Sequence, residues 1–286
     1  MPSESHAVLI TGCSSGIGRE TAKLLATTGR PVYATARNLD SIEDLEALGC
    51  RLLELDVADE TSARRAVDHV IAQEGAVGVL VNNAGINELG AVETLPLERV
   101  RAMFETNLFG MMRMCQLVLP AMREQGWGRI VNVGSMNGRL TFPGMGSYCA
   151  TKHAIEATSD ALRHELRPFG VQVSLIQPGM VKTGLGRTAV ARRAGDHDGP
   201  YGDYMHQVVK TTMTYQDGPM ARLACEASDV AETILKALDA GDRPKARYRV
   251  AASAPLMLTT RKLLPDAAFD AFLRTQFPSP DPAIRA

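Results

Sequence analysis

The sequence predicts an α/β fold in which helices cover both faces of a doubly wound parallel sheet. Short runs rich in β-branched residues alternate with amphipathic stretches of helical length along most of the 286 residues. The runs are apolar almost throughout, as expected for strands that are buried on both faces. No proline- or serine-rich linker interrupts the alternation, so we expect a single domain over residues 1–286.

The strands and helices follow one another in regular order. The expected strands are 7–11, 31–36, 51–56, 77–82, 128–133, 171–177 and, at one edge, 248–251. The helices expected between them are 16–28, 62–73, 97–124, which Gly110 could interrupt, and 148–167. A later helix is expected over 228–240, with Ser228 as its N-cap and Asp229 in its first turn.

Two segments depart from the alternation. Residues 184–220 are rich in glycine, methionine, tyrosine and charge, and show neither a helical nor a strand period. They follow the carboxyl end of the sixth strand, where ligands bind in open α/β sheets, so a mobile substrate lid is favoured over a surface excursion. Residues 254–286 form a C-terminal extension that resembles an amphipathic helix pair divided at Pro265. Its apolar face could pack on the chain or a partner, line a substrate channel, or rest on a membrane surface.

Composition excludes several classes of function. The formal net charge of −1 provides no basic surface for nucleic acid, and no apolar run approaches the ~18 residues that span a bilayer. The five cysteines are scattered without a C-x-x-C pair, so neither a disulfide framework nor a metal site is indicated. No signal-peptide pattern opens the sequence, and we expect a cytoplasmic protein.

A glycine-rich turn lies between the first expected strand and the first expected helix. Its sequence is Thr11-Gly-Cys-Ser-Ser-Gly-Ile-Gly18. Glycines allow the backbone to approach a pyrophosphate, and the helix N-terminus supplies unpaired N–H groups and a positive dipole end. This context predicts a dinucleotide site that includes Gly12, Ser14, Ser15, Gly16, Ile17 and Gly18.

The second expected strand ends at Arg37, nineteen residues after Gly18. An acidic residue near this distance would accept hydrogen bonds from a ribose 2′-hydroxyl. A guanidinium cannot accept a hydrogen bond, but it pairs well with a 2′-phosphate. Arg37 therefore predicts NADP(H) as the cofactor, the alternative being an exposed basic residue at a strand end.

Tyr148 and Lys152 share one helix face at i, i+4, thirteen residues after Ser135. A phenol of ordinary pKa is a poor base near neutrality, and a neighbouring ammonium with an oxidised nicotinamide would lower that pKa. Ser135 follows the fifth strand, where it could hydrogen-bond a substrate oxygen as charge changes on it. The three residues predict exchange of a proton with an alcohol or carbonyl oxygen.

This combination resembles the classical type of the short-chain dehydrogenase/reductase (SDR) family, from about residue 7 to residue 183. The run Tyr-Ala-Thr-Ala-Arg at 33–37 is similar to the 17β-hydroxysteroid and retinol dehydrogenase branch. The resemblance implies a Rossmann fold, an NADP-dependent oxidoreductase, and a homodimer or homotetramer.

The resemblance also implies roles for individual residues. Asn107 would be catalytic through a water linked to Lys152, and Lys152 and Tyr148 would also contact the cofactor. The adenosine contacts implied are Asp56 and Val57 at the adenine and Asn83, Ala84 and Gly85 at its ribose. The contacts implied for the carboxamide and pyrophosphate are Pro178, Gly179, Val181 and Thr183.

Soft, apolar residues surround the expected site, and they predict a hydrophobic substrate. They are Met136, Phe142, Met145, Met180, Met205 and Met213. Methionine tolerates irregular apolar shapes, which suits a steroid, retinoid or lipid-like alcohol or carbonyl. Two alternatives stay open: a 3-ketoacyl thioester reductase, for which Arg187, Arg192 and Arg193 could dock an acidic carrier protein, and a catalytically idle NADP-binding regulator.

Overall fold

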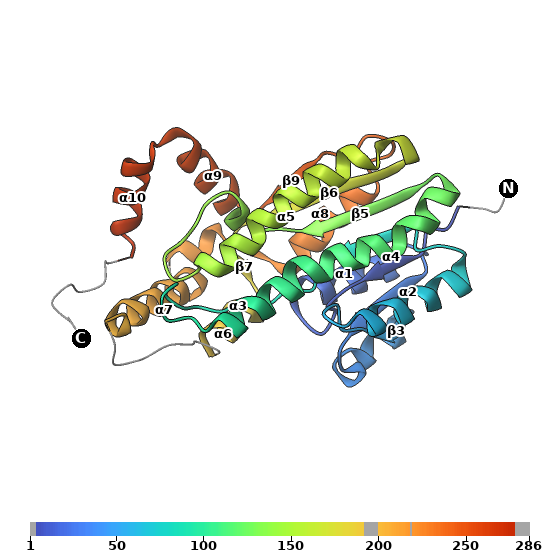
Figure 1. Ribbon diagram of the computed structural model, residues 1–286, viewed down its shortest axis with the longest axis horizontal. Coiled ribbons are helices and arrows are strands. Elements are labelled where there is room, and N and C mark those ends of the chain that lie inside the picture. Colours follow the sequence, from blue (N-terminus) through green and yellow to red (C-terminus); the bar gives the residue numbers. More distant parts are fainter. Residues whose placement is uncertain (1–3, 192–199, 218, 278–286) are drawn as a thin grey trace.

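The computed structural model describes residues 4–191, 200–217 and 219–277. Seven parallel strands form one sheet, in the order β3-β2-β1-β4-β5-β6-β9 (Figure 1). The strands are β1 (Val8–Ile10), β2 (Val32–Ala36), β3 (Arg51–Glu54), β4 (Val79–Asn82), β5 (Gly128–Val133), β6 (Val171–Pro178) and β9 (Arg247–Val250). The order runs outward in both directions from β1 and β4, which confirms the predicted doubly wound parallel sheet.

Alternate residues of each strand pack on opposite faces of the sheet. Val8 and Ile10 belong to a core with α1 (Gly16–Ala26) and α8 (Ala227–Leu238). Leu9, between them, belongs to a second core with α2 (Glu60–Glu74) and α4 (Gly110–Gln125). Every residue of β2 and β5 is buried, so the apolar runs of the sequence reflect coverage on both faces.

The long helix expected over 97–124 is interrupted. It consists of α3 (Leu97–Phe104), a π-helical turn η2 (Glu105–Phe109), and α4. The interruption precedes Gly110, whose own role is close packing: a Cβ there would lie 2.8 Å from a methyl group of Val57. Such π-turns occur mostly as single turns within α-helices and are frequent at functional sites. The next long helix, α5 (Gly146–Glu165), is continuous.

The described parts of residues 184–220 are mainly helical, although their sequence shows no clean helical period. They contain α6 (Gly184–Ala191) and α7 (Gly202–Asp217), with a short 3₁₀ helix η5 (Pro219–Leu223) after them. Ala189, Met205 and Val208 are buried in an apolar cluster with residues from other parts of the chain. Tertiary packing stabilises these helices, because their own sequence period is weak.

The start of α8 also differs from expectation, because Ser228 is not its N-cap. A short parallel pair, β7 (Val181–Lys182) and β8 (Cys225–Glu226), holds Glu226 extended, and the helix begins at the next residue. Glu226 and Asp229 form a capping box, in which each side chain accepts from the other residue's backbone N–H. The expectation of an acidic first turn is confirmed.

The C-terminal extension contains the predicted helix pair. These helices are α9 (Ser253–Leu263) and α10 (Asp266–Arg274), with Pro265 as the N-cap of α10. Both lie toward the same end of the molecule as α7, far from the N-terminus (Figure 1). Further 3₁₀ helices are η1 (Leu39–Leu48), η3 (Met136–Gly138) and η4 (Arg167–Phe169). Within the described ranges no helix is long and apolar enough to cross a membrane.

Candidate active site

The glycine-rich turn is locked against the end of β4. The Thr11 hydroxyl accepts hydrogen bonds from the backbone N–H groups of Asn83 and Ala84, both at 3.0 Å. The Asn83 amide donates in return to the carbonyl oxygens of Thr11 and Gly12 at 2.9 and 3.0 Å. A Cβ on Gly18 would lie 2.4 Å from the Asn83 amide nitrogen, so this position is closed to any larger residue.

Conformation explains the other two glycines of the turn. Gly12 has φ of +74° and Gly16 has φ of +59°, in the left-handed region that favours glycine. A Cβ on Gly12 would also come within 2.9 Å of the Ala84 backbone. The turn therefore brings bare backbone and the N-terminus of α1 to the edge of a cavity of about 390 Å³.

All but one of the residues predicted to bind the cofactor line this cavity. They are Gly12, Ser14, Ser15, Gly16, Ile17, Arg37, Asp56, Val57, Asn83, Ala84, Gly85, Tyr148, Lys152, Pro178, Gly179, Val181 and Thr183. Gly18 does not line it but packs beneath the turn. A dinucleotide fits this lining, because it combines the bare backbone of the glycine-rich turn with polar side chains such as Arg37, Asp56 and Lys152.

Sequence reasoning missed part of the lining. Leu55, Ile86, Thr106 and Val133 contribute from strand ends and from the π-turn, and Leu185 and Thr188 contribute from α6. The strand-end residues directly adjoin predicted ones, so proximity in sequence was an available signal. The α6 residues were hidden because their helix was not predicted.

Arg37 lies at the end of β2, exposed and at the margin of the cavity. Its guanidinium forms no ion pair with a described residue, whereas its neighbour Asn38 caps the helical turn that follows. The position leaves a cation available beside the adenosine end of the cavity.

Ser135, Tyr148 and Lys152 come together at the opposite end of this cavity. Ser135 directly follows the short loop after β5, and the other two residues lie on α5. The Lys152 ammonium donates to the Val133 carbonyl oxygen at 3.0 Å and lies 5.7 Å from the centre of the Tyr148 ring. All three side chains are buried, so charge on any of them is costly.

Burial shifts both pKa values away from the charged forms. It raises the pKa of the Tyr148 phenol above its ordinary value, and a hydrogen bond with Ser135 opposes this shift. It lowers the pKa of Lys152 to about 8. In the protein alone, loss of hydration dominates the pKa of Tyr148; the lowering expected beside an oxidised nicotinamide concerns the complex with the cofactor.

Asn107 lies in the π-turn and is fully engaged in structural contacts. Its amide donates to the Ile86 carbonyl at 2.9 Å and to the Thr151 hydroxyl at 3.1 Å, and its oxygen accepts from the Ile86 N–H at 2.8 Å. It does not line the main cavity. Asn107 thus connects the end of β4 to α5. On α5 it contacts Thr151, the residue that precedes Lys152.

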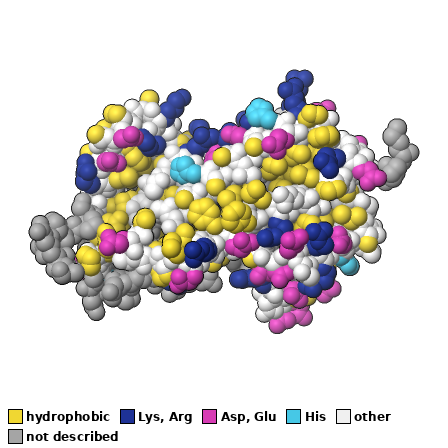
Figure 2. All heavy atoms as spheres, in the orientation of Figure 1, with side chains coloured by type: hydrophobic (Ala, Val, Ile, Leu, Met, Phe, Trp, Pro, Cys, Tyr) yellow, Lys and Arg dark blue, Asp and Glu magenta, His cyan; other side chains and the backbone are white. Residues whose placement is uncertain are grey.

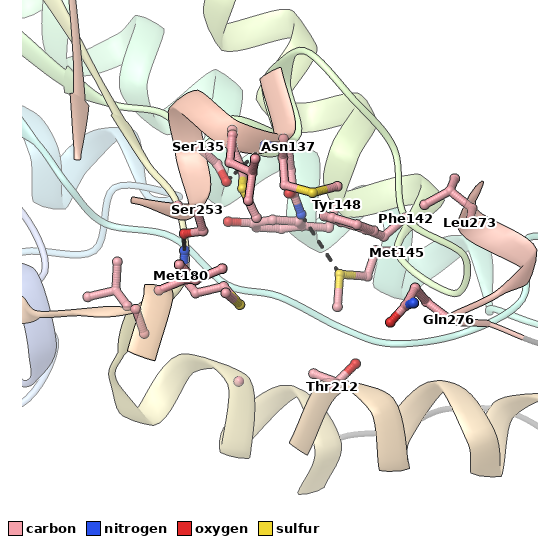
Figure 3. A pocket seen from close by; sticks show the side chains of 18 of the residues that line it. Ser135, Asn137, Phe142, Met145, Tyr148, Met180, Thr212, Ser253, Leu273 and Gln276 are labelled. Atoms are coloured by element: carbon pink, nitrogen blue, oxygen red, sulfur yellow. Dashed lines mark hydrogen bonds between the residues drawn. The ribbon is translucent and has the colours of Figure 1, made fainter. Parts of the chain in front are cut away.

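A second cavity of about 460 Å³ opens beside the first. Residues common to both linings are Asn87, Ser135, Tyr148, Gly179, Val181 and Gly186. Four of the predicted apolar lining residues, Met136, Phe142, Met145 and Met180, line the second cavity. The last three are labelled in Figure 3. Met205 and Met213 do not; Met205 is buried in the apolar cluster behind the wall, so these two predictions were wrong.

The C-terminal helices form one wall of the second cavity. Leu256 and Met257 contribute from α9, Phe272 and Leu273 from α10, and Phe277 follows α10. The C-terminal extension therefore does two of the things considered for it: it packs on the rest of the chain, and it lines a cavity. Arg192 and Arg193, which kept a carrier-protein interaction open, lie outside the described residues, as does the side chain of Arg187.

Comparison with known proteins identifies the family. Residues 6–194 match the family model described as short chain dehydrogenase. The chain belongs to the SDR family. It is 35% identical over 266 residues to a probable short-chain type dehydrogenase/reductase, VdlC, of Helicobacter pylori. The aligned region covers 93% of this chain and 96% of that protein. This confirms the resemblance inferred from the sequence.

Two other relatives extend the comparison. The chain is 41% identical over 183 residues to a 3-ketodihydrosphingosine reductase of Bacteroides thetaiotaomicron, which covers 64% of this chain and 66% of that protein. A crystal structure of a short-chain dehydrogenase from Streptomyces avermitilis superposes with a TM-score of 0.79 at 31% identity, covering 96% of each chain. The chain is thus an oxidoreductase of the SDR family.

Proposed function

We propose that this protein interconverts a hydrophobic secondary or allylic alcohol and its ketone or aldehyde, using NADP(H). One observation carries the proposal: Ser135 and Tyr148 lie where a polar, elongated cavity meets an apolar one. A reaction between a dinucleotide and a hydrophobic molecule requires such a junction, with a proton donor at it.

The residues at the junction divide the chemistry between them. A nicotinamide cofactor held by the lining of the first cavity would supply the hydride in reduction and accept it in oxidation. The Tyr148 hydroxyl gives its proton to the carbonyl oxygen, and the Ser135 hydroxyl donates a hydrogen bond to the same oxygen. Burial raises the pKa of Tyr148, so near neutrality the phenol is protonated, which is the form that donates its proton in reduction. Lys152 would hold the ribose hydroxyls of the nicotinamide.

The choice of NADP(H) rests on Arg37. Its guanidinium is exposed at the adenosine end of the cavity and is not paired with any described carboxylate. A 2′-phosphate offers it a bidentate, charge-assisted contact, whereas a bare 2′-hydroxyl offers none.

A long-chain lipid ketone is the substrate class we favour. The walls from α9 and α10 are apolar, and the similarity to a 3-ketodihydrosphingosine reductase supports a lipid over a sugar or a charged acyl carrier. An idle NADP-binding regulator is disfavoured, because Asn107, Ser135, Tyr148 and Lys152 are all present.

Self-association and a cytoplasmic location complete the proposal. Hydrophobic side chains gather across the middle of the face in Figure 2, over the region that α4 and α5 occupy in Figure 1. Phe109, at the end of η2, is 47% exposed, and Phe109, Met112 and Leu117 line a surface groove. These features favour a homodimer or homotetramer, which sedimentation at micromolar concentration tests. All five cysteines are free thiols, compatible with a reducing compartment.

The decisive experiment is a screen of NADPH consumption over long-chain ketones, steroid ketones, retinal and acetoacetyl thioesters. We expect turnover with long-chain ketones and a clear preference for NADPH over NADH. Activity confined to the thioesters would contradict the substrate class, and activity with none of these compounds would contradict the proposed function.

A further inference from the structure

The segment that follows β6 forms a wall that the two cavities share. Gly179 and Val181 line both cavities, whereas Met180 between them lines only the apolar one. Because this wall belongs to both cavities, a shift of its backbone would change the position of a cofactor relative to a substrate. The contacts that hold the segment in place therefore bear on the reaction.

The peptide groups around Met180 are held by three different parts of the chain. The Met180 N–H donates to the Ser253 hydroxyl oxygen at 2.9 Å, which the dashed line in Figure 3 marks. The Met180 carbonyl oxygen accepts from the Cys225 N–H at 3.0 Å, and the Gly179 N–H donates to the Val250 carbonyl oxygen at 2.9 Å. Backbone groups supply the last two contacts, so Ser253 is the side chain on which the first depends.

The first turn of α9 packs directly on this shared wall. A Cβ on Gly179 would lie 2.2 Å from the Ser253 hydroxyl oxygen and 2.8 Å from the Ala254 nitrogen, so the two backbones are in close contact. Ser253 is 1% exposed, and its hydroxyl is enclosed by the protein. A small displacement of the start of α9 would therefore act on the shared wall.

The chain reaches this contact through a strained turn. Ala251, between β9 and α9, has φ of +69°, in the left-handed region that disfavours residues with a Cβ. The Ala251 carbonyl oxygen accepts from the Ala254 N–H at 3.2 Å, which closes the turn. Strained backbone persists where surrounding contacts fix it, and such positions cluster at functional sites. The turn brings Ser253 onto Met180 only three residues after the strand ends.

We infer that Ser253 is a positioning residue: its hydroxyl fixes the Met180 peptide and thereby the wall between the cofactor and the substrate. The inference rests on the proposed function, because it concerns hydride transfer across the junction of the two cavities. Hydride transfer depends steeply on the relative placement of the two ligands, so loosening this wall should slow it. The affinity for each ligand depends on many other contacts and should change little.

Ser253→Ala tests the inference, because it removes the acceptor and keeps the Cβ. Enzyme that has bound an equimolar amount of NADPH is mixed with excess 2-dodecanone, and the loss of NADPH absorbance in the first turnover is followed. We expect the rate constant to fall by about tenfold or more, whereas the dissociation constant of NADPH and the KM for the ketone should stay within about threefold. The amplitude of this phase reports the fraction of competent enzyme, so a loss of stability alone would lower the amplitude and leave the rate constant unchanged.

Ser174→Ala is the matched control. The Ser174 hydroxyl donates to the Lys245 carbonyl oxygen at 2.9 Å, so this serine also ties β6 to the chain beside β9. It is 3% exposed and lines neither of the two cavities. We expect the rate constant of this variant to stay within about twofold of that of the unmodified enzyme.

Two results would overturn the inference and leave the proposed function intact. The first is a rate constant for Ser253→Ala within about twofold of that of the unmodified enzyme. The second is an equal fall in Ser174→Ala, which would indicate a general loosening between β6 and β9. Where the broader screen finds a better ketone, that ketone replaces 2-dodecanone. Absence of turnover by the unmodified enzyme with every compound would instead contradict the proposed function.

Discussion

The cofactor cavity and the apolar cavity meet at Tyr148 but are built in different ways. The cofactor side is held by backbone: Gly12 and Gly18 leave no room for a Cβ, and Asn83 ties the turn to β4. The apolar side is held by side chains from distant parts of the sequence, such as Phe142 and Phe277, whose ring centres lie 5.9 Å apart. A backbone site tolerates few substitutions, whereas a side-chain wall can change without disturbing the chemistry.

The two sides should therefore respond differently to mutation. Changes at the junction should abolish chemistry, changes on the cofactor side should alter the choice of nucleotide, and changes on the apolar side should alter substrate affinity alone. The predictions below test this division.

The largest effect is expected at the junction. Tyr148→Phe removes the proton donor but keeps the ring, so kcat should fall by about a thousandfold or more. The dissociation constant of NADPH should change by less than about threefold, because the backbone turn and Arg37 remain. Substantial turnover by this variant would contradict the acid/base role, and lost NADPH binding would show that the two cavities are not separable.

The same contrast explains how far the sequence could predict the structure. The dinucleotide turn, the alternation of strands and helices and the residues around Tyr148 follow from local patterns, because each is set by neighbours in the chain. The helices α6 and α7 were missed, and Met205 was misplaced, because these positions depend on packing against α9 and α10.

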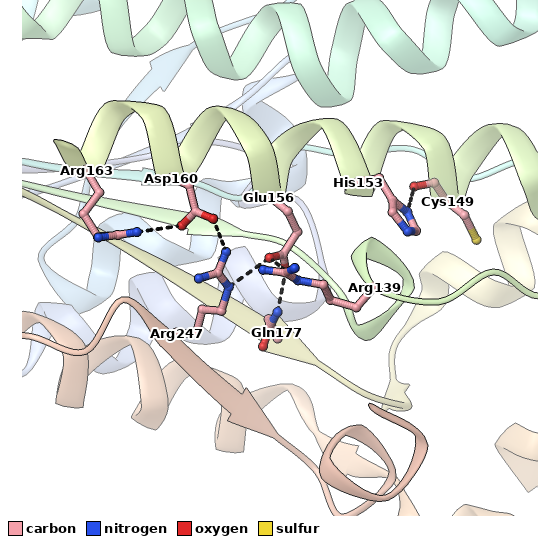
Figure 4. Close-up of polar contacts among 8 residues, drawn as sticks. All are labelled: Arg139, Cys149, His153, Glu156, Asp160, Arg163, Gln177 and Arg247. Carbon is pink, nitrogen blue, oxygen red and sulfur yellow. Dashed lines mark hydrogen bonds and ion pairs between the residues drawn. The ribbon is translucent and has the colours of Figure 1, made fainter. Parts of the chain in front are cut away.

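An ion-pair network links α5 to the turn that carries Ser135 and to the edge of the sheet. Glu156, 4% exposed, lies 2.9 Å from both Arg139 and Arg247, and Arg247 also pairs with Asp160 at 2.6 Å (Figure 4). Arg139 follows the Ser135 turn and Arg247 begins β9, so the network fixes α5 relative to the turn and the sheet edge.

Breaking this network should cost stability. Glu156→Gln leaves two guanidinium groups without their shared carboxylate, and we expect the free energy of unfolding to fall by roughly 3 kcal/mol. The value lies at the low end for buried pairs, because the Arg139 side chain is half exposed. Urea denaturation measures it, with Glu165→Gln, an exposed change on the same helix, as control. Equal urea concentrations at the midpoint of unfolding for the two variants would show that the network does not stabilise the fold.

On the cofactor side, Arg37→Asp should reverse the nucleotide preference. The change replaces a phosphate partner with a repelling carboxylate, so NADPH affinity should fall by about a hundredfold. NADH affinity should hold or improve, because the new carboxylate can accept from a 2′-hydroxyl. Calorimetric titration with both nucleotides gives the comparison. Equal affinities for NADH and NADPH in the unmodified protein would show that Arg37 does not bind the 2′-phosphate.

The pH dependence of reduction should follow the pKa of Lys152. Burial lowers that pKa to about 8, so the ammonium is present below this pH and is lost as pH rises through it. The raised pKa of Tyr148 keeps the phenol protonated over the same range, so the tyrosine contributes no loss there. We expect kcat/KM for ketone reduction to decline above pH 8 by up to about tenfold per unit. A level profile to pH 10 would show that the charge on Lys152 is dispensable.

The smallest effect is expected on the apolar side. Phe272 lies in the wall contributed by α10 and packs against Phe269, with ring centres 6.0 Å apart. Phe272→Ala removes apolar surface from the substrate cavity without touching Ser135 or Tyr148. The KM for a long-chain ketone should rise by about tenfold, whereas kcat and NADPH affinity should stay within about twofold. Short ketones that do not reach α10 serve as the internal control, since their KM should not change. A fall in kcat with the short ketone would mean that the wall also positions the catalytic turn. The apolar cavity and the catalytic residues could then not be changed independently.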